Sequence, residues 1–547
     1  MNDIDEKALR FIKNMGVTHV WYTGIIRHAT QTDYSSHGIP RQHADVVKGK
    51  AGSPYAIADY YDVDPDLAVE VEHRMQEFEA LVERTHRAGM KVIIDFVPNH
   101  VAREYKSICK PEGVRDLGED DDTGMHFSTN NNFYYCWGQP LDLSGIRGTS
   151  PLLSKGELRG VSSLSTHYIE IPARATGNDQ FSNHPGQNDW YETVKLNYGI
   201  DYCDAGGRSE HFLPIPNTWG KMTDILLFWA QKGIDGFRCD MAEMVPTAFW
   251  TWATDKLRFL YPEVVFVGEV YDPNLYRHYI SAGFNYLYDK VGMYDCVRDV
   301  ICGYRPASDI TRQWQATDDI RHHMLYFLEN HDEQRVASDF FAGNGWRGIP
   351  GLVVCALLMK NPFMLYAGQE LGERGMDEEG FSGRDGRTTI FDYWQVGSTW
   401  RAYFNRRQLK KDEKSLMLEY QKVLLIATRE KAVSQGDTFD LMYVNPAISE
   451  RQNAFLRKAG DEMLLIVANF SDSEVSCDVV IPQHAFDFLQ IPKRTLSAYD
   501  LMTGESQVLI MLPDEPLHMT IGKNTARVWK MSCRTISHLS TSFPSGN

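Results

Sequence analysis

The stretch Ile234-Asp-Gly-Phe-Arg-Cys-Asp240 is a short, largely apolar run that ends on a carboxylate. Two later segments repeat the pattern: Val264-Val-Phe-Val-Gly-Glu269, and the run 324–328 followed by Glu-Asn-His-Asp332. Helical segments lie between successive runs, which is typical of a parallel sheet covered by helices. Because the carboxyl ends of parallel barrel strands meet on one face, the pattern predicts that Asp240, Glu269 and Asp332 converge there.

The same alternation extends over most of the chain. Further strand-like runs lie at 17–22, 91–97, 284–288 and 363–367. The chain opens on a helix, so the count is eight helices and seven strands. This tally fits a (β/α)8 TIM barrel that lacks its first strand. An open doubly wound sheet is the alternative that alternation by itself leaves open.

The regular pattern assigns residues 1–100 and 200–433 to the barrel. Between them, residues 101–199 are rich in Gly, Asn, Asp and Ser, and a structureless loop of that length is uncommon inside a compact domain. We interpret this segment as a subdomain inserted after the third barrel strand. Short strand-like runs over 434–531 predict a C-terminal antiparallel β-sandwich. The tail 532–547 is expected to be disordered.

The composition of the chain argues against two classes of binding partner. The chain has 56 Lys and Arg against 73 Asp and Glu, a formal net charge of −17, which argues against nucleic acid or an anionic membrane. We find no signal-peptide pattern at the start and no apolar run of membrane-spanning length. Nine cysteines are scattered without metal-binding spacing, which indicates reduced thiols. We therefore expect a cytoplasmic protein, and the oligomeric state stays open.

Paired carboxylates are the groups that break a glycosidic bond. Arg238 lies two residues before Asp240 on the same strand, so both side chains point to one face and the guanidinium should keep Asp240 ionised. Glu269 follows an apolar strand, where partial burial would raise its pKa as a general acid requires. A single acid at a strand end is more often a solvated carboxylate or a salt bridge. Three acids in barrel order favour catalysis.

Four segments, in this order, resemble the α-amylase family, glycoside hydrolase family 13. They are Asp95-Phe-Val-Pro-Asn99-His100, Gly236-Phe-Arg-Cys-Asp240, Gly268-Glu-Val270 and Asn330-His-Asp332. Two further blocks, 53–60 and 195–197, also resemble the family. The resemblance covers about residues 5 to 535, and the presence of all the blocks in order makes it specific.

The resemblance implies a role for each matching residue. Asp240 matches the nucleophile, Glu269 the general acid/base, and Asp332 the third carboxylate, which holds sugar hydroxyls. The substrate-binding positions match Tyr55, His100, Arg238 and His331. Tyr55 would stack beneath the sugar at the cleavage subsite, and the two histidines would hydrogen-bond that sugar. Packing in the core is the alternative for Tyr55 and for each histidine.

The resemblance implies no required cofactor and leaves calcium open. Asn99 matches a position that is a calcium ligand in many members, but one Asn is no calcium site, because Ca²⁺ takes six to eight oxygens. The chain also departs from many starch-cleaving members after the nucleophile, where it reads Met241-Ala-Glu-Met244. This departure puts the calcium link and the contacts to the reducing side of the substrate in doubt.

Taken together, the residues and the resemblance predict a retaining hydrolase that cleaves α-1,4 bonds of starch-type glucans or maltooligosaccharides through a glycosyl–Asp240 intermediate. The alternatives are an α-glucan transglycosylase with the same triad and a non-catalytic barrel that binds sugar or a partner protein. The missing first strand lies upstream of Met1, or the barrel is incomplete. In the second case the strands at 17–22 and 363–367 would have unpaired edges and the protein would be less stable. In the insert, Trp137, Trp190 and Tyr191 are candidate sugar platforms, with core packing the alternative.

Overall fold

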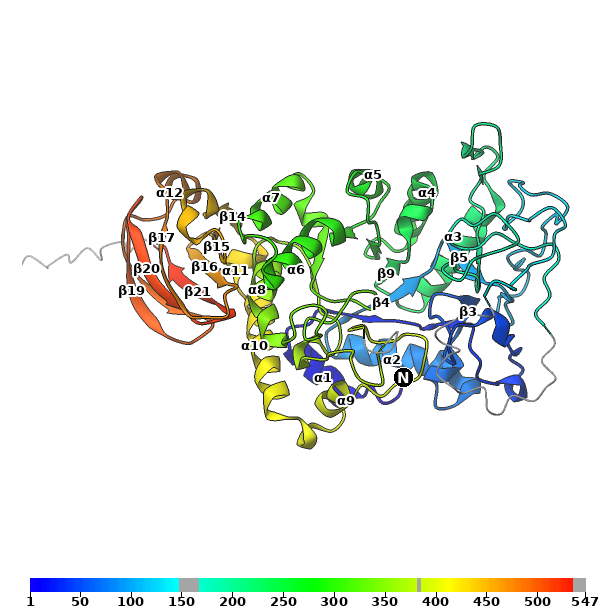
Figure 1. The fold of residues 1–547 in the computed structure, drawn as a ribbon, viewed down its shortest axis with the longest axis horizontal. Helices are drawn as coiled ribbons and strands as arrows, with labels where there is room; N and C mark the ends of the chain where they lie inside the picture. The colour runs from blue at the N-terminus through cyan, green and yellow to red at the C-terminus, as the bar shows by residue number, and fades with distance from the viewer. Residues whose placement is uncertain (147–166, 381–384, 535–547) are drawn as a thin grey trace, which may run out of the picture.

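The structure, a computed structural model, describes residues 1–146, 167–380 and 385–534. Figure 1 shows an elongated molecule with a helix-covered barrel in its middle. The strands of the C-terminal domain, coloured orange to red, lie at one end, and the inserted segment around β5 lies at the other.

Seven strands form one parallel sheet in the order β1-β4-β9-β10-β11-β12-β13. Their bounds are β1 (His19–Tyr22), β4 (Lys91–Phe96), β9 (Gly236–Cys239), β10 (Val265–Gly268), β11 (Tyr286–Tyr288), β12 (Met324–Phe327) and β13 (Phe363–Met364). Spatial order follows chain order, as in a TIM barrel and unlike a doubly wound sheet. The predicted barrel class is confirmed. In the register, Asp95 of β4 lies opposite Arg238 of β9, so the two side chains share one face.

Helices follow the strands along the chain. They are α1 (Glu6–Asn14), α2 (Arg74–Arg87), α3 (Asn217–Gln231), α4 (Thr247–Leu260), α5 (Tyr276–Ser281), α6 (Asp295–Cys302), α7 (Asp309–Ala316), α8 (Ile349–Leu357), α9 (Gly397–Tyr403), α10 (Lys411–Arg429) and α11 (Lys431–Ser434). The first begins at Asp5, whose carboxylate accepts the Ala8 N–H at 2.8 Å, and it is followed by Gly16 at φ +94°. A Cβ at Gly16 would lie 3.1 Å from the Leu424 backbone, so α1 packs closely against α10 there.

The two end strands of the sheet have unpaired edges. Among the described residues, β1 pairs only with β4 and β13 pairs only with β12. His19 is exposed and Phe363 and Met364 are half-buried, whereas every residue of β9 and β12 is buried. These two strands are the ones expected to flank the position of the first barrel strand. The last strand has two residues rather than the five expected over 363–367.

Short antiparallel pairs lead into and out of the inserted segment. β5 (His100–Ala102) pairs with β6 (Thr193–Lys195), which places His100 opposite Lys195. β7 (Ile200–Asp201) pairs with β8 (Ser209–Glu210). A further pair, β2 (Ile26–His28) with β3 (Ile57–Val63), lies between β1 and α2 and was not predicted from the sequence.

The C-terminal domain is antiparallel, as predicted. A six-stranded sheet in the order β14-β15-β16-β21-β18-β19 is accompanied by the β17–β20 pair. The elements are β14 (Asp437–Asp440), β15 (Gln452–Ala459), β16 (Glu462–Asn469), β17 (Val475–Val480), α12 (Gln483–Leu489), β18 (Arg494–Asp500), β19 (Ser506–Met511), β20 (Pro516–Ile521) and β21 (Thr525–Ser532). Of the tail expected to be disordered, residues 535–547 lie outside the described residues.

Two general expectations can be compared with the structure. All nine cysteines lie in the described part of the chain, and none forms a disulfide. Among the described helices, none is both long and apolar enough to cross a membrane.

Candidate active site

The structure brings Asp240 and Glu269 together through one guanidinium. Arg238 Nη1 lies 2.8 Å from Asp240 Oδ1, and Nη2 lies 2.9 Å from Glu269 Oε2. Both carboxylates follow neighbouring strands, β9 and β10, and both are buried, with 6% and 2% of their surface exposed. Two carboxylates that share one guanidinium line the same small volume, which is the arrangement that glycosidic bond cleavage needs.

A third buried carboxylate, Asp95, belongs to this cluster. Its Oδ1 lies 3.4 Å from Arg238 Nη1, and its Oδ2 accepts the indole N–H of Trp21 at 2.9 Å. Asp95 opens the first of the four family-like segments, but no role was assigned to it from the sequence. Its position at the end of β4, two strands from Glu269, is the signal that would have identified it.

The charges in this cluster are unbalanced. Burial, together with the negative charges of Glu269 and Asp95, raises the pKa of Asp240 to about 8, although Arg238 acts in the opposite direction. Burial also raises the pKa of Asp95. Arg238 acts in the expected direction, because its guanidinium contacts Asp240 and lowers the pKa of that carboxyl. Burial and the two neighbouring carboxylates outweigh this effect, since one guanidinium serves three carboxylates.

Glu269 is held on both oxygens. Its Oε1 accepts the Tyr271 hydroxyl at 2.6 Å, and its Oε2 accepts the backbone N–H of Met241 at 2.8 Å. Met241 has the left-handed backbone conformation, φ 43° and ψ 43°, which turns its N–H toward Glu269. Tyr271 was not identified from the sequence. Its spacing of two residues from Glu269 was the available signal.

Asp332 joins the site through His331. The His331 Nε2 atom lies 3.1 Å from Asp332 Oδ2 and 2.8 Å from the Tyr55 hydroxyl. Although burial disfavours both charged forms, each partner stabilises the other, so the pKa of His331 is raised and that of Asp332 is lowered. The Asp332 side chain is 47% exposed, unlike the buried Asp240 and Glu269, so it can reach a ligand from solvent.

Tyr55 lines the site with a mostly buried ring and does not present an open surface on which a sugar could stack. Its ring stacks on His331 with centroids 5.2 Å apart and an interplanar angle of 25°, and the Arg238 guanidinium lies 5.4 Å from its centroid. Only 8% of Tyr55 is exposed. The predicted grouping of Tyr55, Arg238 and His331 is thus present in the structure.

His100 joins this group from the start of β5, where the chain enters the inserted segment. It hydrogen-bonds the backbone of Tyr55, and its ring lies 5.2 Å from that of Trp190. Burial, assisted by the positive charges of Lys195 and Lys48, lowers the pKa of His100 to about 3. His100 is therefore a neutral hydrogen-bonding group at ordinary pH. Trp190 is half-buried beside it, whereas Trp137 is 67% exposed.

The surroundings of Asn99 do not fit calcium. The Asn99 Oδ1 atom accepts a hydrogen bond from Lys195 Nζ at 2.8 Å, and the Asn99 Nδ2 atom donates to the Gly177 carbonyl at 2.7 Å. The buried Lys195 ammonium also lies 2.5 Å from Asp179 Oδ1. The Lys195 ammonium thus lies where a calcium ion would need oxygen ligands, and it would repel the ion.

Comparison with known proteins gives the same picture over most of the chain. The family described as "Alpha amylase, catalytic domain" matches residues 2–143 and 214–436. "Alpha-amylase 3" of Dictyoglomus thermophilum is 23% identical over 535 residues, which cover 94% of this chain and 89% of the relative. An "Alpha-amylase" of Streptomyces lividans is 23% identical over 290 residues, 51% of this chain and 28% of that longer relative.

A solved structure shares the fold. The α-amylase of Geobacillus thermoleovorans, complexed with acarbose, superposes with a TM-score of 0.61 at 17% identity, covering 97% of this chain and 93% of its own. The family match spans more than half of the chain and includes the segments that carry Asp95, Asp240, Glu269 and Asp332. The chain therefore belongs to the α-amylase family, glycoside hydrolase family 13.

Proposed function

We propose that this protein is a retaining glycosidase that cleaves α-1,4-glucosidic bonds in maltooligosaccharides or starch-type glucans. The observation that carries the proposal is the contact of the Arg238 guanidinium with both Asp240 and Glu269. It holds a nucleophile and a proton donor in one buried volume, which is the pair that double displacement requires. The family and the acarbose complex of the Geobacillus enzyme support an α-glucan as substrate.

In the first step, Asp240 attacks the anomeric carbon while Glu269 gives its proton to the leaving oxygen. In the second, Glu269 takes a proton from water, and the resulting nucleophile breaks the bond to Asp240. The first step requires a protonated Glu269 and an ionised Asp240. Arg238 contributes by stabilising the ionised Asp240.

The surrounding groups orient the reactants. Tyr271 and the Met241 N–H fix both oxygens of Glu269, so the carboxyl group cannot rotate away from the scissile bond. His331 and the partly exposed Asp332 offer a hydrogen-bond donor and an acceptor to sugar hydroxyls. We infer that Asn99 does not hold calcium, because the Lys195 ammonium already bridges Asn99 and Asp179.

A timed incubation with maltoheptaose tests the proposal. Reducing ends and product lengths are followed together, with Asp240→Asn as the inactive variant and Asp255→Asn, on the exposed side of α4, as the matched control. We expect shorter products and rising reducing ends from wild type and Asp255→Asn, and neither from Asp240→Asn. Redistributed lengths at constant reducing ends would show transfer to a sugar acceptor instead. Turnover by Asp240→Asn would contradict the assigned nucleophile.

A further inference from the structure

The loop over residues 329–336, which contains Asp332 and is called the Asp332 loop below, is closed by a buried glutamate. Glu329 follows β12 and is 1% exposed, and its Oε1 accepts the backbone N–H of Val336 at 2.7 Å, seven residues further along the chain. Its Oε2 lies 3.0 Å from Arg335 Nη1. Because the two ends of the loop are joined in this way, the direction of the side chains between them depends on these contacts.

The turn inside the Asp332 loop is fixed by Asn330. Its Oδ1 accepts the backbone N–H groups of Asp332 and Glu333, both at 2.9 Å. An Asx turn of this kind sets the local shape of the loop. It does not set the position of the loop relative to the other strands, which has to come from contacts outside it.

Arg335 makes contacts with two other segments of the barrel. Its side chain is 2% exposed. Besides Glu329, its Nη1 donates to the carbonyl of Ala367, in the segment that follows β13, at 3.0 Å. Its Nε donates to Thr388 Oγ1 at 3.0 Å, and its backbone N–H donates to the Gly386 carbonyl at 2.7 Å. One buried side chain therefore ties the Asp332 loop to the last strand of the sheet and to residues 386–388.

Close packing holds Arg335 in this arrangement. Gly386 has φ +84°, and a Cβ at this position would lie 2.6 Å from Ser338 Oγ, so residues 386–388 lie directly against the chain that follows the Asp332 loop. The Arg335 guanidinium also lies 3.9 Å from the centroid of the Tyr366 ring, within the range of a cation–π contact.

We propose that Arg335 is a positioning residue, which fixes Asp332 and its partner His331 relative to Asp240 and Glu269. In the part of the chain that the structure describes, Arg335 forms no hydrogen bond or ion pair with any of these four residues, so it acts through the Asp332 loop. A lysine would keep the charge, but it lacks the planar set of donors that reaches three acceptors at once. The catalytic consequence rests on the proposed function, whereas the position of the loop does not.

The His331 ring reports the position of the loop without any substrate. Although burial disfavours its charged form, the Asp332 carboxylate 3.1 Å away raises the pKa of His331 above its usual value. NMR of ring-labelled histidine measures this pKa, with the signal assigned by its absence from His331→Gln. We expect Arg335→Lys to lower it by at least about one pH unit, and to lower it no further once Asp332→Asn is present. An unchanged pKa in Arg335→Lys, or an equal further fall in the Asp332→Asn background, overturns the proposal.

Kinetics with maltoheptaose test the consequence for catalysis. Arg335→Lys should lower kcat about 10- to 100-fold, with KM changed less, because a catalytic group displaced by about 1 Å can cost about 100-fold. Thr388→Val removes only the acceptor of Arg335 Nε and should lower kcat by about threefold. This milder variant also decides the question if Arg335→Lys does not fold, and a wild-type kcat and His331 pKa in Thr388→Val would then overturn the proposal.

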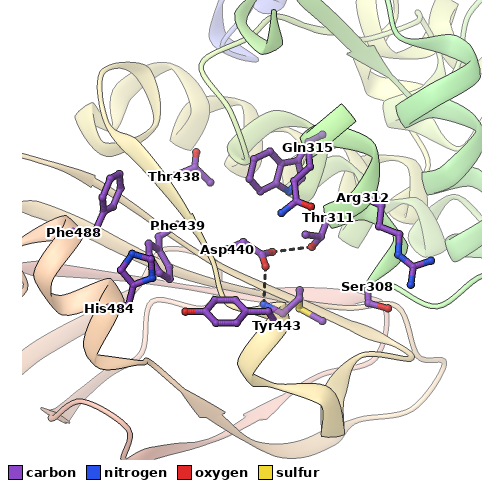
Figure 2. A pocket seen from close by; sticks show the side chains of 12 residues that line it. Ser308, Thr311, Arg312, Gln315, Thr438, Phe439, Asp440, Tyr443, His484 and Phe488 are labelled. Carbon is purple, nitrogen blue, oxygen red and sulfur yellow. Dashed lines mark hydrogen bonds between the residues drawn. The ribbon is translucent and has the colours of Figure 1, made fainter. Parts of the chain in front are cut away.

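Arg457→Lys is the matched control for the loss of a buried guanidinium. Arg457 is 1% exposed and donates to the Leu358 carbonyl at 3.0 Å. It also contacts the hydroxyl of Thr438 on β14, which Figure 2 shows beside the cleft between α7 and the C-terminal domain. No residue that lines this cleft belongs to the active site described above. Arg457→Lys should lower Tm as Arg335→Lys does, and it should keep the wild-type kcat and His331 pKa.

The outcomes separate the two proposals. A lowered His331 pKa in Arg335→Lys, in a protein whose wild type hydrolyses no α-glucan, overturns the proposed function and supports the position that Arg335 gives to the loop. Hydrolysis by wild type with the same kcat and His331 pKa in Arg335→Lys overturns the positioning role and leaves the proposed function. An equal fall of kcat in Arg457→Lys would show general destabilisation and would also overturn the positioning role. Circular dichroism and thermal unfolding show whether each variant is folded.

Discussion

Lys195 donates a hydrogen bond from Nζ to Oδ1 of Asn99 at 2.8 Å, in the place where the sequence left a calcium ligand open. The same ammonium contacts Asp179, so Lys195 links the end of β4 to the insert, although burial lowers the pKa of its ammonium. We predict that EDTA and added calcium leave both activity and Tm unchanged. A fall in Tm with EDTA would contradict this account.

A substitution at Lys195 tests the predicted independence from calcium more directly. Lys195→Met should destabilise the protein by about 3 kcal/mol, because it leaves the buried Asn99 oxygen and the Asp179 carboxylate without their donor. Calcium should not restore the lost stability. The control is Lys410→Met, at an exposed lysine, which should unfold in urea at nearly the wild-type concentration.

Tyr271 should act as a positioning residue for Glu269. Tyr271→Phe removes one donor from a buried carboxylate and keeps the ring, so kcat should fall about 10- to 100-fold, with KM changed less. The loss of a donor to the carboxylate should also move the pH–activity profile toward alkaline pH. Tyr304→Phe, at an exposed tyrosine, is the control. An unshifted profile with a lower kcat would indicate only a structural role.

Asp95 should set the acidic limb of the pH profile. The pKa of Asp240 is raised to about 8 by burial and by Glu269 and Asp95, so the ionised nucleophile is lost as pH falls through that value. Asp95→Asn removes one negative charge and keeps an acceptor for Trp21. The acidic limb of kcat/KM should therefore move to lower pH, by about one unit. A limb that stays in place would show that Asp95 does not couple to the nucleophile.

His100 should make the fold sensitive to acid. Its folded pKa is lowered to about 3, below the unfolded value near 6.5, so the unfolded state binds the extra proton between these values. Its contribution to stability is complete above pH 6.5 and declines as pH falls, by about 2 kcal/mol at pH 5. Urea unfolding at pH 7 and pH 5 should show a smaller pH effect for His100→Gln than for wild type. His278→Gln, at an exposed position on α5, should keep the wild-type pH effect.

The sequence was a good guide to the barrel because strand ends are local signals. An apolar strand that ends on Asp240 or Glu269 places the carboxylate on the face of the barrel at which the parallel strands end, and this holds independently of distant parts of the sequence. The partners of these acids were less predictable. Asp95 and Tyr271 gain their roles from register and side-chain direction, and Lys195 is separated from Asn99 by 96 positions.

The C-terminal strands show a second reason why parts of the structure could not be predicted from the sequence. The sequence pattern is weak in β15, which contains Gln452, Arg457 and Lys458 and does not alternate cleanly. Arg457 is nevertheless buried, because its guanidinium donates to the backbone carbonyls of Ala432 and Leu358. A side chain that reads as solvated in the sequence is thus satisfied by segments far along the chain.

In the part of the chain that the structure describes, no strand pairs with the outer edges of β1 and β13, so the barrel wall has a seam there, and separating these two strands breaks no ladder hydrogen bond between them. Local unfolding on heating should therefore begin at the seam, and backbone amides of β1 should exchange with deuterium before those of β9. Trp21 belongs to β1, and its indole holds Asp95 beside Arg238. Motion of this strand would disturb the carboxylate cluster directly, so on heating catalysis should fail while the core is still folded.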